Sequence, residues 1–200
     1  ESSPVVRDLT LKTASLLEEL GHRVEVLDNP VPSNFVDDFL LYWASLALTL
    51  VQTGRRSFGR SFDRGRLDNL TLGLAKHATR NLHRLPVAIT RLRSIGRVTG
   101  RLYENCDVLL TPTLAEETPR IGHLDPTTDY RQIIDRLVDW AAFTPLQNAT
   151  GEPAVSLPLG ESPSGMPVGM MFAAPLGHER RLIELAFELE AARPWARIQG

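Results

Sequence analysis

Apolar residues recur at helical spacing near the start of the chain and predict a helix there. They are Val6, Leu9, Thr13, Leu16 and Leu20. Ser3 and Pro4 precede this face as N-cap and first helical residue, and Gly21 follows it as the residue that ends the helix. The segment His22–Leu27 then predicts a strand, and a helix joined to a strand through one glycine is typical of α/β proteins.

Residues 35–103 predict a block of helices. Phe35–Thr53 is strongly apolar, and the segments Gly65–His83 and Pro86–Tyr103 repeat apolar residues at helical spacing. The polar, arginine-rich stretch Gly54–Arg64 is expected to link the first two helices.

The last half of the chain predicts both strands and helices. Asp107–Thr111 is expected to form a strand, and a helix begins after Asp129, which has the spacing of a capping residue. Ala154–Leu159 and Val168–Ala173 are short apolar runs joined by the turn Gly160–Gly165. This pattern indicates two adjacent antiparallel strands. A final helix follows Gly177 and ends before Pro194.

Composition and length favour one globular domain. The 200 residues are 42% hydrophobic and carry a net charge of −2. The single cysteine, Cys106, excludes an internal disulfide, is compatible with a reducing compartment and is interpreted as a packed residue. No apolar run reaches the roughly 18 residues that span a bilayer, and no signal segment is evident. We therefore expect a cytoplasmic protein without a membrane partner, and the start at Glu1 fits a fragment of a longer polypeptide.

The arginine-rich segment Arg55–Arg66, with Phe58 and Phe62 between the arginines, is a candidate nucleic-acid surface. Its alternative is a solvated connector between helices. The sequence pI of about 6.2 contrasts with values above roughly 9 that are typical of such binders. We therefore favour the connector and expect no nucleic-acid partner, since a nucleic-acid role would require salt-sensitive binding through this segment.

Other candidate sites have simpler interpretations. The five histidines lack the spacing that places two metal ligands on one helical face. Gly160-Glu-Ser162 begins like a nucleophile elbow, but Ser164 replaces the second glycine of that motif. Ser156 lies in an apolar strand and is interpreted as a packed hydroxyl. Four carboxylates that could form an acid/base set are more simply a helix cap and solvent-facing charges. They are Asp129, Asp135, Asp139 and Glu152.

The segment Phe143–Gly151 is a non-repetitive stretch of apolar and amide residues immediately before a predicted strand. Loops that flank sheet strands are where α/β proteins gather binding residues. Gln147 and Asn148 would alternatively satisfy backbone groups of a turn. Both interpretations stay open.

Several segments in a fixed order carry a family resemblance. They are Asp107-Val-Leu-Leu-Thr-Pro-Thr113, Phe143–Gly160, Gly165–Ala174 and a closing helix that ends at Arg193-Pro-Trp195. This ordered set, spread over most of residues 107–195, resembles the C-terminal part of the amidase signature family, whose members hydrolyse carboxamide bonds.

The resemblance implies a single α/β/α domain with a mixed β-sheet covered by helices, of which this chain would supply the C-terminal portion. Residues 22–27, 107–111, 154–159 and 168–173 would be sheet strands, and the helical block 35–103 would overhang the substrate cleft. The resemblance also implies that Phe143, Gln147 and Asn148 help to wall the pocket for a small-molecule amide. No metal or organic cofactor is implied.

The family's catalytic residues are a serine nucleophile, a second serine held by a cis peptide bond, and a lysine. The serines come from a Gly/Ser-rich loop, and this chain has no such run. Its Ser2-Ser3 pair precedes Pro4, and Lys12 and Lys76 have the surroundings of surface groups. We therefore expect no catalytic residue in this chain, no activity from it alone, and the missing N-terminal half of the same polypeptide as its partner. The alternative is a non-catalytic α/β binding module, which the upstream gene sequence would distinguish.

Overall fold

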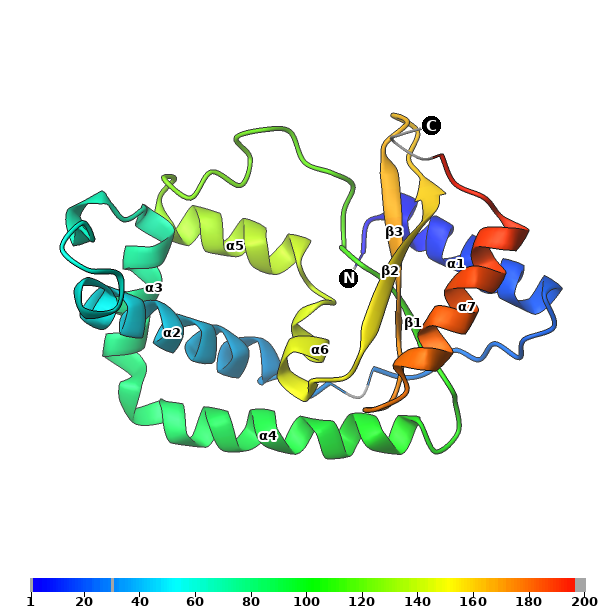
Figure 1. The fold of residues 1–200 in the computed structure, drawn as a ribbon, viewed down its shortest axis with the longest axis horizontal. Helices are drawn as coiled ribbons and strands as arrows, with labels where there is room; N and C mark the ends of the chain where they lie inside the picture. Colours follow the sequence, from blue (N-terminus) through cyan, green and yellow to red (C-terminus); the bar gives the residue numbers. More distant parts are fainter. Residues whose placement is uncertain (1, 30, 197–200) are drawn as a thin grey trace. The chain divides into compact units, whose positions relative to one another are not determined.

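The computed structural model describes residues 2–29 and 31–196, and Figure 1 shows their helices and strands. The α/β class expected from the sequence is confirmed. The chain divides into two compact units. The first contains residues 1–30, 96–119 and 140–200, and the second contains residues 31–95 and 120–139.

The first unit is built on a small antiparallel sheet in which β3 (Pro167–Ala173) lies between β1 (Leu109–Pro112) and β2 (Ala154–Glu161). The register pairs Leu110 with Phe172 and Val155 with the same Phe172. The predicted antiparallel pairing of the two C-terminal strands is confirmed. The first strand begins two residues later than expected.

One face of this sheet is covered by α1 (Pro4–Glu19) and α7 (Glu179–Ala192). Because side chains alternate along a strand, every second residue of β2 and β3 enters the same core. Buried residues of this core are Val6, Leu9, Leu17, Leu157, Leu159, Val168, Met170, Phe172, Leu182, Leu185 and Leu189. The predicted ends of α1 are also confirmed: the Ser3 hydroxyl accepts from the Val6 amide at 3.3 Å, and Gly21 has a φ of 96°.

The predicted strand His22–Leu27 is wrong for the described structure. Residues 22–29 have no regular secondary structure, and Val26 is 96% exposed. A strand requires a neighbouring strand for its backbone hydrogen bonds, and the described sheet has β1 and β2 at its edges. The segment has the residues of a strand but no partner strand.

The second unit is helical, as predicted for most of residues 35–103. It contains α2 (Phe35–Phe58), α3 (Asn69–Asn81), the first part of α4 (Leu85–Leu102) and most of α5 (Tyr130–Trp140), with short 3₁₀ turns at Arg64–Arg66 and Leu82–Arg84. Ala44, Leu74, Ala78 and Ile134 form its buried cluster. Asp129 caps α5 as predicted, since its carboxylate accepts from the Arg131 and Gln132 amides at 3.0 and 3.4 Å.

The expected linker at Gly54 begins later, because α2 continues to Phe58. Gly54 is buried, and a side chain there would collide with the ring of Phe62. By length and composition alone, α2 is also long and apolar enough to cross a membrane. Helices packed inside proteins meet the same criterion, and α2 contributes Ala44 to the unit's core.

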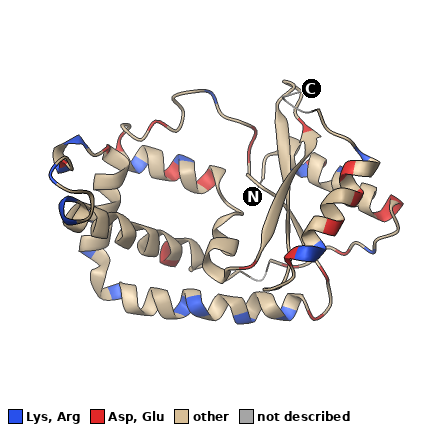
Figure 2. Cartoon of the chain, viewed as in Figure 1, with Lys and Arg blue, Asp and Glu red and all other residues tan. Residues whose placement is uncertain are grey.

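The arginines of α4 lie on its exposed side, and Figure 2 shows basic residues along this helix. Arg93, Arg97 and Arg101 are exposed, whereas Leu92 and Ile95 are buried. The positive charge of this helix is therefore a solvated face.

We expect the isolated chain to self-associate, because β1 and β2 each pair only with β3 among the described strands. Unpaired strand edges recruit other chains. Light scattering at several protein concentrations measures this, and the apparent mass should rise with concentration. A monomer with cooperative unfolding and no dye-binding apolar surface would contradict the prediction.

Candidate functional site

Among the described residues, no lysine lies beside a pair of serines. Ser3 caps α1, and Lys12 on that helix pairs with Asp8 at 2.7 Å while both side chains remain largely exposed. Lys76 is exposed on α3. The serines and lysines that the sequence offers therefore have structural or surface positions.

The predicted pocket segment contains a short helix that the sequence analysis missed. It is α6 (Pro145–Thr150), with proline in its first turn and Gly151 in the left-handed conformation at its end, where φ is 75°. Proline at the start and glycine after the end are the usual signals of a helix. Six residues are too few to show an apolar periodicity, which is why the segment looked like a loop.

The three predicted pocket residues differ in their surroundings. Phe143 precedes α6 and is partly buried. Gln147 is partly buried, and its side-chain oxygen is buried without a hydrogen-bond donor among the described residues. Asn148 is exposed, and its side-chain amide donates to the Thr144 carbonyl at 3.3 Å. Asn148 thus satisfies a backbone group, whereas the acceptor of Gln147 has no protein partner in this part of the chain.

A pair of hydroxyls lies beside β3 and was missed by the sequence analysis. The hydroxyl oxygens of Thr113 and Ser156 are 2.6 Å apart. Ser156 was expected to be packed but is exposed, because β2 turns Leu157 and Leu159 to the core and Ser156 to the opposite face. A β-carbon at Gly169 would lie 2.6 Å from the Ser156 oxygen and 2.8 Å from the Thr113 oxygen. The absence of a β-carbon at position 169 therefore leaves room for the two hydroxyls.

Glu152, between α6 and β2, is a buried carboxylate that the sequence analysis did not distinguish from the solvent-facing acids. It is 8% exposed, and both of its oxygens accept from hydroxyls at the C-terminal end of α4, one in its last turn and one just after it. Thr99 donates to one oxygen, and Tyr103 donates to the other at 3.2 Å. Burial, followed by the nearby charge and hydrogen bond of Glu152, raises the pKa of Tyr103 far above its usual value. The phenol therefore stays protonated and available as a donor.

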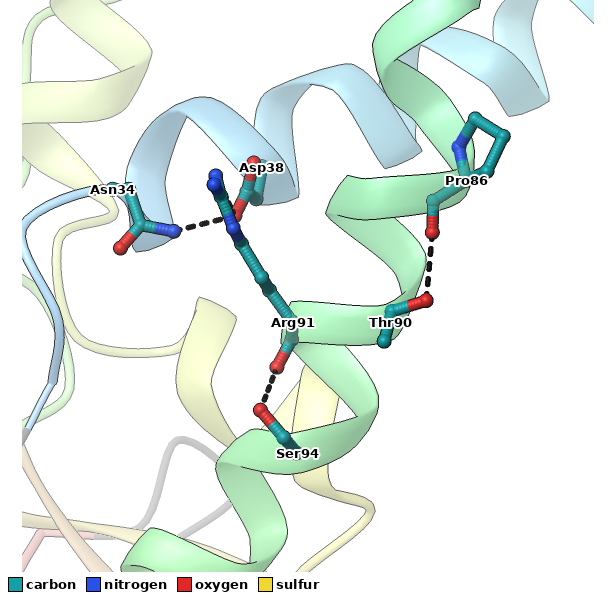
Figure 3. Close-up of polar contacts among 6 residues, drawn as sticks. All are labelled: Asn34, Asp38, Pro86, Thr90, Arg91 and Ser94. Atoms are coloured by element: carbon teal, nitrogen blue, oxygen red, sulfur yellow. Dashed lines mark hydrogen bonds and ion pairs between the residues drawn. The ribbon is translucent and has the colours of Figure 1, made fainter.

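The second unit has its own buried carboxylate, drawn in Figure 3. Asp38 in the first turn of α2 is 4% exposed. The side-chain amide of Asn34 donates to it at 2.6 Å, and the guanidinium of Arg91 on α4 lies 3.6 Å away. Unlike Glu152, Asp38 has a cationic partner, and the contact joins the start of α2 to α4.

The second unit also has an apolar hollow of about 260 Å³ between α2 and α3. No charged side chain of the described residues lines it. Its lining residues are Trp43, Leu46, Ala47, Leu50, Leu70, Thr71 and Leu74. The hollow can accommodate an apolar group but offers little polar chemistry beyond the Thr71 hydroxyl.

Comparisons with known proteins give the family and the fold. The family model described as Amidase matches residues 1–183. The candidate amidase AmiC of Mycobacterium leprae (strain TN) is 66% identical over 200 residues, which is all of this chain and 42% of that protein. The chain therefore spans less than half the length of this relative.

Two solved structures are similar to the chain. A 6-aminohexanoate cyclic dimer hydrolase, determined with its substrate, superposes with a TM-score of 0.84 at 26% identity, covering 97% of this chain and 42% of that one. A bacterial aryl acylamidase of the amidase signature enzymes superposes with a TM-score of 0.76 at 21% identity, covering 97% and 41%. The second likeness is one of fold alone.

Substitution of Gly169 by alanine should destabilise the chain by about 1–3 kcal/mol, because the new methyl group overlaps two hydroxyl oxygens. Denaturant unfolding measures the change. Adding Ser156→Ala should recover part of the loss. Gly100→Ala on α4 is the matched control, since a β-carbon there meets nothing within 4 Å. Equal unfolding midpoints for Gly169→Ala and the parent would contradict the close packing of Gly169 against the two hydroxyls.

Proposed function

The chain belongs to the amidase signature family, and from this premise we propose that the whole protein hydrolyses a carboxamide to a carboxylic acid and an amine or ammonia. The observation that carries the proposal is the family match over residues 1–183. The likeness to the 6-aminohexanoate cyclic dimer hydrolase also supports the proposal, because its 26% sequence identity is higher than that of structures that share the fold alone.

In the proposed mechanism, a serine outside this sequence attacks the carbonyl carbon of the amide. A cis-serine and a lysine, also outside this sequence, take the serine proton and return a proton to the leaving nitrogen. Backbone N–H groups hold the oxyanion, and water then releases the acid from the acyl-serine. This chain would supply the C-terminal half of the fold and part of the substrate pocket, with no catalytic residue of its own.

We place the substrate pocket beside α6, with Phe143, Gln147 and Asn148 in its wall. Gln147 is the residue of this set with the strongest structural support. A buried oxygen without a donor is costly, and an amide substrate offers an N–H that would satisfy it. The Phe143 ring, which is partly buried, would supply apolar contact.

The proposal also covers the partners and the location of the protein. A small-molecule amide and the rest of the same polypeptide would be its partners, and the edges left unpaired in the described sheet support the second of these. A cytoplasmic location agrees with a single, partly buried cysteine, Cys106. Turnover of simple amides by the purified whole protein tests the proposal, and no turnover across acyl and aryl amides would contradict it.

The isolated 200-residue chain should hydrolyse no amide or ester, because it lacks a serine, serine and lysine set. A chromogenic amide and ester assay on the pure chain measures this. Ser156→Ala and Ser162→Ala are the controls. Ser162 is buried in a turn, where its hydroxyl accepts from the Met166 amide at 3.2 Å. Turnover that disappears in either variant would make that serine a nucleophile.

In the whole protein, Gln147→Ala should change relative kcat/KM among amides at least several-fold and leave the free energy of unfolding nearly unchanged. The reason is that the side-chain oxygen makes no protein hydrogen bond in the described chain, so its removal leaves no partner unsatisfied. Gln132→Ala, at an exposed position of α5, is the matched control. A loss of about 1–3 kcal/mol with unchanged specificity would instead assign Gln147 to bracing the turn.

A further inference from the structure

Glu152 occupies an unusual position for a carboxylate. It is buried, and no cation of the described chain forms an ion pair with it. Its partners are two neutral hydroxyls, those of Thr99 and Tyr103. Burying a carboxylate without a counter-charge is costly, and an apolar residue of similar volume is often at least as stable in such a place. A contribution to stability therefore does not by itself explain why a carboxylate occupies this position.

The carboxylate lies where α6 is joined to the rest of the first unit. Gly151 ends α6 and donates to the Gln147 carbonyl at 2.8 Å. On the other side of Glu152, the Pro153 carbonyl accepts from the Ala174 amide at 3.1 Å, next to the end of β3. The junction is thus held to the sheet by a backbone bond and to α4 by the Glu152 side chain.

The two hydroxyl bonds are directional, whereas apolar packing is not. Thr99 lies in the last turn of α4, and Tyr103 is the first residue after that helix. A carboxylate that accepts from both has one orientation, and this fixes the angle at which α6 leaves the junction. Gln147 lies on α6, just under one turn before its last residue, Thr150.

We propose that Glu152 is a positioning residue for amide recognition: it ties the junction that follows α6 to the C-terminal end of α4, so that Gln147 keeps its place in the substrate pocket. This inference rests on the proposed function. Glu152 itself contacts neither substrate nor reacting atoms, and it acts through α6.

The test compares Glu152→Gln with Glu152→Leu in the whole protein. Glutamine keeps the shape and can still bond both hydroxyls, whereas leucine fills the space without directional bonds. Glu161→Leu is the matched control, because Glu161 is exposed at the other end of β2. Thr99→Val and Tyr103→Phe each remove one donor and remain informative if Glu152→Leu does not fold.

The first readout is hydrogen exchange of peptides that cover residues 143–153, with α7 as the internal reference. We expect at least tenfold faster exchange in α6 for Glu152→Leu, smaller increases for Thr99→Val and Tyr103→Phe, and parent-like exchange for Glu152→Gln and Glu161→Leu. Unchanged exchange of α6 in all variants would overturn the proposal. This readout needs no activity, so it is decided even if the whole protein hydrolyses no amide.

The second readout is the ratio of kcat/KM for hexanoyl and acetyl p-nitroanilides. We expect Glu152→Leu to change this ratio at least tenfold and Glu152→Gln to restore it to within threefold of the parent. A lower thermal midpoint with an unchanged ratio would show a merely structural role and overturn the proposal. Absence of turnover in the parent would contradict the proposed function instead.

Discussion

Side chains alternate between two faces along β2 and β3, and the large apolar groups occupy one face, with buried Met171 as the exception on the other. Leu157 and Leu159 on β2, and Met170 and Phe172 on β3, bury themselves against α1 and α7. This burial fixes the register of the sheet, because a shift of one residue would turn every apolar side chain to the opposite face. The opposite face then receives the small and polar residues, including Ser156. The hydroxyl pair beside Gly169 is a direct consequence of that alternation.

The same constraint locates the segment with the strongest claim to function. Since β2 must start at Ala154 to keep its register, the residues before it have to reach the sheet by a sharp turn. Gly151 supplies that turn with a φ of 75°, and the helix that it ends is α6. Gln147 and Glu152 lie on either side of this glycine. Gln147 has a buried oxygen without a donor among the described residues, and Glu152 has its oxygens held by hydroxyls at the end of α4.

Much of the fold was predictable from the sequence, because it depends on local signals. The ends of α1 follow from Ser3, Pro4 and Gly21, and the two C-terminal strands follow from apolar runs around a glycine-rich turn. The failures have physical causes. Residues 22–27 have the composition of a strand but no pairing edge. The six residues of α6 are too short for a periodic signal. The Glu152 contacts join residues 49 and 53 positions apart, which no local pattern reveals.

In the proposed function, a chain of this family that lacks the nucleophile would still have a defined chemical task, which is to set the shape of the pocket. Bond cleavage requires groups that stabilise the charge that develops in the transition state. The described residues do not bring such groups together. In the proposed function, substrate selection requires only fixed acceptors and apolar walls, and the α6 junction would provide both in one short segment. Differences in substrate between related amidases would then arise in residues such as Gln147 and Glu152, while the catalytic groups stay the same. Under this proposal the energetic cost of a buried carboxylate would be offset, because a displacement of about 1 Å in a substrate site can lower the rate about 100-fold.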